Sequence, residues 1–281
     1  MTDTLSTRKL AIVDISEGIA TITFNDPERL NPLGRDMRIA VGTALAEADA
    51  DPDVRCVILT GSGRAFSTGA DQSHGDPVES AYDWYWLIYK NPYGVAPIDP
   101  FNMRKPVIAA INGMCYGAGM IHAAECDLVI AAESARFCMI ESRMAHGGAA
   151  ALPFFIGPQW ARFLMYTGEI ISAQKAKEIG LVLEVVPDAE LADRTRELAA
   201  RVAAMPGHGV EMNKQQINGT MDMMGWGANK TFSASHGAVL DSAALGATLP
   251  DGRDLLEIHR REGFRAFKDA RDAAHKKPWL R

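Results

Sequence analysis

A loop of small residues, Gly117-Ala118-Gly119, is the first place in this sequence where chemistry can be expected. It follows a short apolar run, residues 107–111, and precedes residues 120–125, which favour a helix. The first N–H groups of a helix have no partner inside the helix and carry the positive end of its dipole. Because Gly and Ala leave these groups accessible, the loop is suited to bind an anion or a developing oxyanion. The same small residues are also typical of tight helix–sheet packing, so the loop alone does not decide the function.

Two buried strands are expected to position such a loop. Residues 107–111 form an apolar run between Pro106 and Asn112-Gly113, which is typical of a strand buried on both faces. A second run, residues 57–60, ends at Gly61 and leads into a polar, glycine-containing segment up to Asp71. Strands that alternate with helical segments indicate α/β layering.

The two segments together resemble the crotonase (enoyl-CoA hydratase/isomerase) family. The matching sequences are G-S-G-R-A-F-S-T-G-A-D at 61–71, K-P-V-I-A-A-I-N-G at 105–113 and C-D-L-V-I-A-A-E-S-A-R-F at 126–137, with a weaker match, P-E-R-L-N-P-L, at 27–33. The resemblance implies an α/β fold, a crotonase-like spiral of repeated strand-strand-helix units with a C-terminal helical region. In this family two backbone N–H groups hold the thioester oxygen of an acyl-CoA substrate. By position these groups belong to Ala70 and Ala118.

A proton-transfer group is needed as well, because two N–H groups polarise a thioester but cannot move a proton. Hydratases of the family use two carboxylates, and the matching positions here are Ile121 and Glu141. Ile121 is apolar and departs from the hydratase pattern. Glu141 follows an apolar run, where burial disfavours the charged form of a carboxyl group. The resemblance makes Glu141 the single acid/base, whereas without it Glu141 would be a surface residue at the end of a strand. The segment after Glu141 is shorter than is usual in the family.

The expected activity is double-bond migration in an enoyl-CoA through an enolate held in an oxyanion hole. Hydration of an enoyl-CoA remains an alternative. A second alternative is retro-Claisen hydrolysis of a β-diketone, which some members perform with histidines, and His122 and His146 are the candidates. Each histidine is equally explained as a hydrogen-bonded core residue. A catalytically silent trimeric scaffold is the alternative outside the enzymes.

Substrate contacts are expected from several further segments. Aromatic residues concentrate at 72–102 and either line an acyl site or pack a core helix. The segment 262–268 resembles the C-terminal E-G-x-x-A-F motif of the family, and the basic tail after it either contacts coenzyme A phosphates or is a solvated end. The candidates for substrate binding are Arg29, Asp71, Trp84, Trp86, Tyr89, Ile121, His122, His146 and Phe267.

The sequence breaks at residues 205–209, where Pro and Gly interrupt the helical pattern. We therefore expect a crotonase-like core over residues 1–205 and a helical region over 206–281. The resemblance implies that these helices cover a site and support a homotrimer or a dimer of trimers. Two strands at 10–15 and 19–25 are expected to form a hairpin, and Asn31-Pro32 is expected to open a helix.

Composition excludes several classes of protein. The formal net charge of −6 and the lack of a long basic run argue against nucleic-acid binding. No apolar run approaches a membrane span and no secretory signal is recognisable, so a cytoplasmic location is expected. The four cysteines form no C-x-x-C pair and no zinc pattern, and we expect reduced, mostly buried thiols. No metal and no cofactor are expected beyond the coenzyme A of the substrate.

Overall fold

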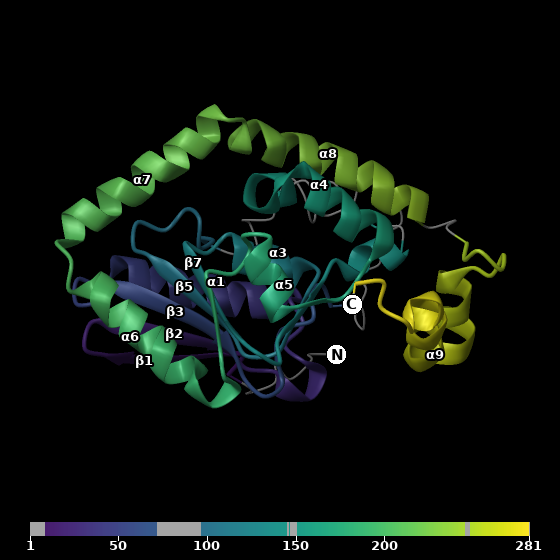
Figure 1. Cartoon of the computed structure of the whole chain (residues 1–281), viewed down its shortest axis with the longest axis horizontal. Helices are drawn as coiled ribbons and strands as arrows, with labels where there is room; N and C mark the ends of the chain where they lie inside the picture. Colours follow the sequence, from purple (N-terminus) through teal and green to yellow (C-terminus); the bar gives the residue numbers. More distant parts are fainter. Residues whose placement is uncertain (1–8, 72–96, 145, 147–150, 245–247, 281) are drawn as a thin grey trace, which may run out of the picture.

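The larger of two β-sheets forms the centre of the protein (Figure 1). The computed structural model describes residues 9–71, 97–144, 146, 151–244 and 248–280. The first two strands of this sheet are antiparallel and the others pair in parallel. The six strands, in order across the sheet, are β1 (Ala11–Ser16), β2 (Ile19–Phe24), β3 (Cys56–Gly61), β5 (Val107–Ile111), β7 (Leu128–Ala132) and β10 (Glu184–Val186).

The expected hairpin joins β1 and β2. Ser16 pairs with Ile19, so only Glu17 and Gly18 form the turn. Both residues have positive φ angles, 52° and 74°, as a two-residue turn between twisted antiparallel strands requires.

The smaller sheet shows how the chain forms the predicted spiral of repeated units. It contains β4 (Ala65–Ser67), β6 (Met114–Tyr116), β8 (Arg136–Cys138) and β9 (Ile171–Ser172), in that order. The chain runs from β3 to β4, from β5 to β6 and from β7 to β8, so each passage places one strand in each sheet. Helix α3 (Ala118–Ala124) follows β6, and α4 (Leu152–Thr167) follows β8 after the short 3₁₀ helix η3 (Ile140–Met144). This is the predicted strand-strand-helix repeat, and the α/β fold class is confirmed.

Apolar packing on both faces of the larger sheet explains its continuous hydrophobic strands. Val107, Ala109 and Ile111 face the main core, whereas Ile108 and Ala110 face a second cluster on the opposite side. Helix α1 (Arg35–Ala50) packs in the main core and α6 (Leu191–Ala203) packs on the second cluster. Because successive side chains of a strand point to opposite faces, a strand covered on both sides is apolar throughout.

Asn31 corrects one expectation about the first helix. Helix α1 begins at Arg35 with Gly34 at its N-cap, and Asn31 does not cap it. Asn31 has a φ of 55° and is fully buried in the loop that follows the 3₁₀ helix η1 (Pro27–Arg29). Its amide accepts the Asp26 N–H at 2.8 Å and donates to the carbonyl oxygens of Ser62 and Ala65 at 3.0 and 2.8 Å. Asn31 therefore ties its loop to the β3–β4 connection.

The C-terminal third is helical, as expected. Ser172 caps α5 (Ala173–Glu178) by accepting the Lys175 N–H at 3.1 Å. After the 3₁₀ helix η4 (Asp188–Glu190) and α6, three long helices and a final 3₁₀ turn complete the chain. These are α7 (Gly207–Met223), α8 (Trp226–Ala244), α9 (Leu255–Asp272) and η5 (Ala273–His275). Within the described ranges no helix combines the length and the apolar character needed to cross a membrane. The division into two domains remains a prediction.

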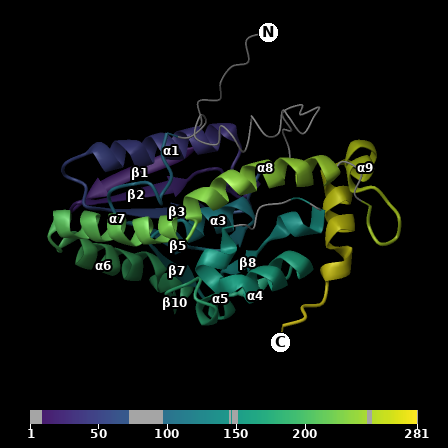
Figure 2. The same cartoon turned by 90° about the horizontal axis from the view of Figure 1, so that it is seen from above.

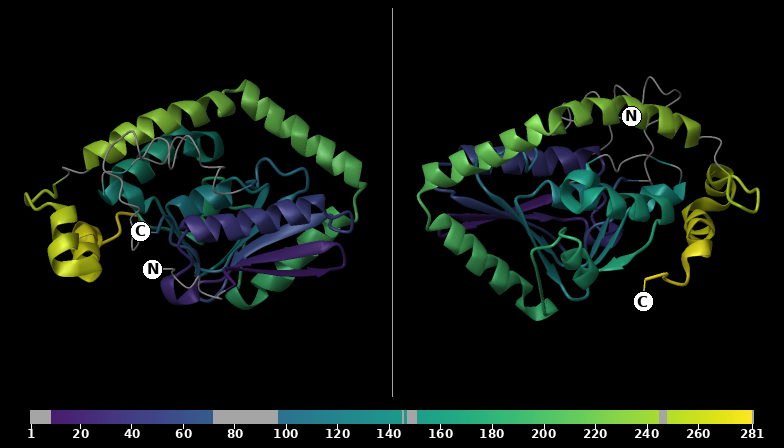
Figure 3. Two further views of the ribbon diagram at one scale, coloured as in Figure 1. Left: turned by 180° about the vertical axis from the view of Figure 1, so that it is seen from behind. Right: turned by 45° about the horizontal axis from the view of Figure 1, so that its top comes forward.

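The long helices form an arch over the body. Helix α7 rises from the end of α6, and α8 crosses above α4 (Figures 1 and 3). Seen from above, α9 stands beside the far ends of α4 and α8 (Figure 2). The underside of α8 is held by Trp226, which is buried against Phe101, Phe154 and Phe155 with ring centroids 5.0–5.5 Å away.

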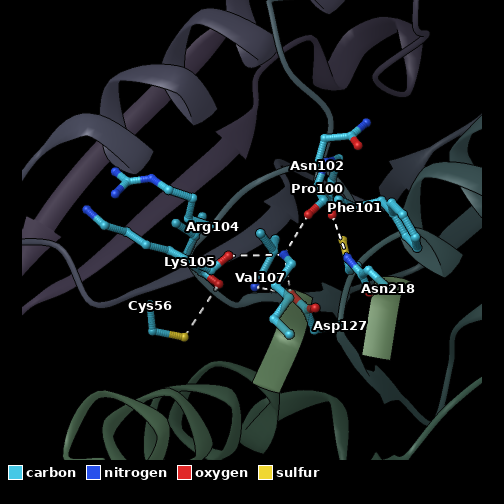
Figure 4. A network of polar contacts seen from close by, with 12 residues as sticks. Cys56, Pro100, Phe101, Asn102, Arg104, Lys105, Val107, Asp127 and Asn218 are labelled. Carbon is cyan, nitrogen blue, oxygen red and sulfur yellow. Dashed lines mark hydrogen bonds and ion pairs between the residues drawn. The ribbon is translucent and has the colours of Figure 1, made fainter. Parts of the chain in front are cut away.

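A buried lysine joins α7 to the central sheet. Lys214 Nζ donates to the carbonyl oxygens of Pro100 and Lys105 at 2.7 and 3.1 Å, and to Asp127 Oδ2 at 2.8 Å. Asp127 Oδ2 also accepts the N–H of Val107 at the start of β5 (Figure 4). Burial raises the pKa of Asp127, and the Lys214 charge and the hydrogen bonds oppose that rise. One network therefore fixes both α7 and the first residues of β5.

Candidate active site

Three loops meet at one edge of the smaller sheet. The strands β4, β6 and β8 are neighbours and run in parallel, so their C-terminal ends lie at the same edge. Ala70 follows β4, Ala118 follows β6 and Glu141 follows β8. The three residues predicted to carry the chemistry therefore come from equivalent positions of three successive repeats.

Glu141 and Ala118 are in direct contact. The backbone N–H of Ala118 donates to Glu141 Oε1 at 2.8 Å. Ala118 is the first residue of α3, so this N–H has no partner within the helix. Beside it, the Gly117 N–H donates to the carbonyl oxygen of Cys138 at 2.8 Å, which joins the Ala118 loop to the end of β8. A carboxylate and a helix N-terminus are thus held within hydrogen-bonding distance of each other.

Two glycines permit this close approach. Gly117 has a φ of 53°, and a Cβ atom there would lie 2.0 Å from Glu141 Oε1. Gly69 has a φ of 90°, and its Cβ would lie 2.8 Å from the Tyr116 carbonyl oxygen and 3.1 Å from the Ala118 nitrogen. Any larger residue would have to move the opposite loop. The backbone immediately before Ala70 therefore lies against the backbone of Ala118.

The Ala70 loop is also held from its other side. The Leu33 N–H donates to the Gly69 carbonyl oxygen at 2.7 Å, and the Thr68 N–H donates to the Leu30 carbonyl oxygen at 3.1 Å. Arg29 forms an ion pair with Asp71 and a second one with Asp26, at 3.4 Å. Of the predicted substrate contacts, Arg29 and Asp71 therefore lie together beside Ala70.

Ile121 and His122 follow Ala118 on α3. Ile121 is partly buried and packs on the main core together with Ala118. The His122 ring lies 6.0 Å from the Phe24 ring, and its Nε2 atom has no hydrogen-bond partner within the described part of the chain. Burial lowers the pKa of His122 to about 4; the Asp99 carboxylate opposes this shift, and the positive charge of Arg38 adds to it. His122 is therefore a neutral imidazole at physiological pH.

A second buried ionisable group lies one turn further along the same helix. Burial raises the pKa of Glu125 to about 7, and the nearby Asp99 carboxylate adds to the effect. The positive charges of Lys230 and Arg38 act in the opposite direction. Nothing in the sequence pattern had indicated this residue, because a Glu at the end of a helix is usually solvated.

The turn that carries Glu141 is packed from behind by the C-terminal helix. Met144, at the end of η3, belongs to an apolar cluster with Leu255, Ile258 and Phe267 of α9. Phe267 is therefore placed behind the Glu141 turn. His146 lies just after the turn, and its backbone N–H donates to the Glu141 carbonyl oxygen at 3.1 Å. Trp84, Trp86 and Tyr89 lie outside the described residues.

Sequence reasoning missed two residues that organise this region. Asn31 joins its own loop to the β3–β4 connection through its buried amide, and Arg143 binds the turn from behind, as described below. A signal for Arg143 was present in the sequence, because it is the only charged side chain within two residues of Glu141 on either side. Within the described ranges no group of three or more His, Cys, Asp or Glu side chains is arranged to hold a metal ion.

Comparison with known proteins agrees with this geometry. Residues 14–240 match the model of the enoyl-CoA hydratase/isomerase family. The chain is 36% identical over 210 residues to 1,2-epoxyphenylacetyl-CoA isomerase of Escherichia coli, covering 73% of this chain and 80% of that protein. It is 34% identical over 267 residues to (E)-benzylidenesuccinyl-CoA hydratase of Thauera aromatica, covering 93% and 97%.

Solved structures give the same result. An enoyl-CoA hydratase/isomerase from Xanthobacter autotrophicus superposes with a TM-score of 0.83 at 31% identity, covering 95% of this chain and 99% of that one. A monofunctional enoyl-CoA isomerase from M. smegmatis superposes with a TM-score of 0.63 at 30% identity, covering 79% and 98%. The chain belongs to the enoyl-CoA hydratase/isomerase (crotonase) family and is an enzyme of that family. The predicted family is therefore confirmed.

Proposed function

We propose that the enzyme moves the double bond of a 3-enoyl-CoA to the 2-position, with Glu141 as its single acid/base. The contact between the Ala118 N–H and the Glu141 carboxylate carries this proposal, because a proton acceptor lies next to the N–H that we propose as a donor to the thioester oxygen. In a bound enoyl thioester, C2 is bonded to the carbon that carries that oxygen. A base within reach of the oxygen's binding site is thus within reach of the C2 proton.

The reaction follows from these positions. The thioester oxygen takes the N–H groups of Ala70 and Ala118, and the Glu141 carboxylate leaves Ala118 and faces C2. Glu141 removes a proton from C2, and the electrons move to the thioester oxygen as a dienolate. The two N–H groups stabilise this negative charge. The same carboxyl group then returns the proton at C4, which leaves the double bond between C2 and C3.

Ile121 favours isomerisation over hydration. Hydration needs one group to activate a water while a proton is delivered to C2, and two carboxylates divide that work naturally. The second position here is an apolar residue packed on the main core. An apolar side chain also keeps water away from the dienolate, so proton return at C4 meets less competition.

The test of the proposal is Glu141→Gln, which removes the base and keeps the shape of the side chain. We expect isomerisation to fall by about two to four decades, the usual contribution of a general acid/base. Binding of a saturated acyl-CoA, measured by calorimetry, should change little. Isomerisation by Glu141→Gln at the rate of the parent would exclude Glu141 as the base.

The acyl group is proposed to carry an aromatic ring. The names of two relatives, an epoxyphenylacetyl-CoA isomerase and a benzylidenesuccinyl-CoA hydratase, both specify a phenyl group. The segment 72–102 of this chain is rich in Trp and Tyr, including Trp84, Trp86 and Tyr89, and aromatic walls suit aromatic ligands. A 3-enoyl thioester with a phenyl ring on C4 should therefore be preferred to a straight-chain one. Equal kcat/KM for both would contradict this assignment.

The β-diketone hydrolase alternative depends on His122. Its buried, neutral imidazole with an Nε2 that lacks a described partner could act as a base. Against this, the ring lies beside Phe24, whose own neighbour is the core residue Phe66. Turnover of a cyclic β-diketone without coenzyme A, lost in His122→Leu and retained in Glu141→Gln, would favour this alternative.

Three further properties complete the proposal. The enzyme is proposed to need no cofactor beyond the coenzyme A of its substrate. It is proposed to act in the cytoplasm, in agreement with four free, buried cysteines. It is proposed to assemble as a homotrimer or a dimer of trimers, because exposed apolar residues are frequent on α7 and α8.

A further inference from the structure

A buried arginine lies two residues after Glu141 on the same 3₁₀ turn. The Arg143 side chain is only 4% exposed. Its Nε and Nη2 donate to the Gly168 carbonyl oxygen at 2.9 and 2.6 Å. Gly168 ends α4 with a φ of 59°, and a Cβ there would lie 2.7 Å from Arg143 Cγ. The guanidinium group therefore fits against a helix end that has no side chain.

The third nitrogen of the Arg143 guanidinium group, Nη1, contacts the C-terminal helix. Arg143 Nη1 donates to Asp272 Oδ1 at 2.9 Å, and Asp272 is the last residue of α9. Arg271 also donates to this carboxylate, at 2.9 and 2.8 Å. Burial alone would raise the pKa of Asp272, but the two guanidinium groups outweigh it and lower the pKa. Asp272 thus stays ionised at neutral pH.

The residues after α9 are anchored to the same helix end. The Trp279 backbone N–H donates to Glu169 Oε1 at 3.1 Å, and its ring lies 5.5 Å from Phe163 of α4. The C-terminal helix contacts the Glu141 turn in two ways. Asp272 pairs with Arg143, and Phe267 lies in one apolar cluster with Met144. The two residues of the ion pair, Arg143 and Asp272, are far apart in the sequence.

We propose that Asp272 is a positioning residue, which acts through Arg143 to hold the Glu141 carboxylate at the Ala118 N–H. This inference rests on the proposed function for the role of Glu141. Neither residue touches the reacting atoms. Arg143 is oriented by two fixed acceptors, the Gly168 carbonyl and the Asp272 carboxylate, and a planar guanidinium group needs both to be held in one orientation. Without Asp272, the backbone of the turn would keep its conformation, but the Arg143 side chain would lose one of its two acceptors.

The experiment compares Asp272→Ala with the parent and with Asp251→Asn. Asp251 forms an exposed ion pair with Arg253 at 2.7 Å in the same C-terminal region, so it controls for loss of a carboxylate there. The first readout is hydrogen–deuterium exchange of the peptide spanning residues 114–120. Because the Ala118 N–H is bound by Glu141, we expect faster exchange in Asp272→Ala only. This readout does not depend on which reaction the enzyme catalyses.

The second readout is steady-state kinetics with a 3-enoyl-CoA. A small displacement of a catalytic group can reduce the rate by up to about a hundredfold, and we expect Asp272→Ala to lower kcat at least about tenfold with KM within about twofold. Asp272→Glu, which keeps the carboxylate, should restore part of the loss. Unchanged exchange at residues 114–120 in Asp272→Ala would overturn the positioning role whether or not the parent is an isomerase. A parent without isomerase activity, combined with faster exchange in Asp272→Ala, would overturn the proposed function and leave the positioning role supported.

Discussion

At the scale of single residues, one backbone N–H is proposed to bind two acceptors in turn. The Ala118 N–H holds the Glu141 carboxylate in this structure, and it is the group proposed to hold the thioester oxygen of the substrate. In the proposed mechanism the carboxylate leaves this N–H when the substrate binds, and it then faces C2. The second proposed donor, Ala70, directly follows Gly69, which lies against the same loop because it has no side chain.

The Ala70 donor is tested by two substitutions at one position. Ala70→Pro removes the N–H and Ala70→Gly keeps it. Because one oxyanion donor contributes about 3–4 kcal/mol, turnover of the Pro variant should fall by about two to three decades while the Gly variant stays near the parent. Circular dichroism must first show that the Pro variant is folded. A folded Ala70→Pro enzyme with parental kcat would remove Ala70 from the site.

Two groups on α3 make opposite contributions to the pH dependence of stability. The pKa of Glu125 is raised from 4.5 to about 7, so between these values the folded protein holds a proton that the unfolded chain has lost. Stability from this group therefore falls as pH rises. The pKa of His122 is lowered from 6.5 to about 4, so the unfolded chain holds the extra proton between these values. Stability from His122 rises with pH and is lost as pH falls. Asp99, Arg38 and Lys230 are the charged groups that act on this pair.

Replacing either of the two groups should show the pH dependence of stability that the other one causes. Glu125→Gln should show stability that rises between about pH 4 and 6.5, by up to about 1.4 kcal/mol per pH unit. His122→Leu should show stability that falls between about pH 4.5 and 7. Urea unfolding over this pH range measures both curves. If the two variants keep the pH profile of the parent, these residues are not the groups that titrate.

At the scale of elements, a continuous apolar sequence made the longer buried strands predictable. Residues 107–111 and 128–132 are buried on both faces, and their continuous apolar sequences are recognisable. The strands β4 and β6 have only three residues each and were not expected. Three residues cannot display a period, and β6 directly follows the turn residues Asn112-Gly113. The second sheet became clear only from the pairing of segments distant in sequence.

For the site residues as well, contacts between distant parts of the sequence were not predictable. The loops of Ala70 and Ala118 were assigned through the resemblance to the crotonase family, because small residues after a buried strand do not by themselves decide the function. Asn31 was expected to cap a helix because Asn-Pro favours a helix start, but with its left-handed backbone its amide joins its own loop to the β3–β4 connection instead. Long-range contacts such as Arg143 with Asp272 leave no local pattern, because partners far apart in sequence are chosen by the fold.

Because Lys214 joins α7 to the central sheet, we expect its replacement to lower the stability of the protein strongly. Lys214→Ala leaves Asp127 without its positive partner, and breaking a fully buried pair typically costs about 3–5 kcal/mol. Because the Asp127 side chain is 24% exposed, we expect a loss of about 2–3 kcal/mol in the free energy of unfolding. Lys177→Ala, at an exposed position of α5, should change it by less than about 0.5 kcal/mol. Denaturant unfolding that gives both variants the same stability would show that this network contributes little.

At the scale of the whole molecule, the arch of α7 and α8 presents apolar side chains to solvent. Met223 is 84% exposed and Phe232 62%, and further exposed apolar residues on these helices are Met212, Ile217, Met224 and Val239. A monomeric protein rarely leaves so many large apolar side chains uncovered on adjoining elements. This surface is the best candidate for contacts in the proposed assembly.

A charge placed on this surface should separate the subunits. Met223→Lys combined with Phe232→Lys should reduce the molar mass measured by light scattering to that of one chain, because each buried lysine would lack a partner. Ile15→Lys, on the edge strand β1, serves as the control and should keep the parental mass. A parent protein that is monomeric at micromolar concentration would contradict the predicted assembly.

The central claim is that one carboxylate, with the apolar Ile121 at the position of a second carboxylate, performs double-bond migration in preference to hydration. The most direct measurement gives the parent enzyme a 3-enoyl-CoA and the matching 2-enoyl-CoA in separate assays, and follows 2-enoyl and 3-hydroxyacyl formation by chromatography. The account predicts a higher kcat/KM for isomerisation than for hydration, and a shift towards hydration in Ile121→Glu. Efficient 3-hydroxyacyl formation by the parent, with little isomerisation, would contradict the account and identify the enzyme as a hydratase.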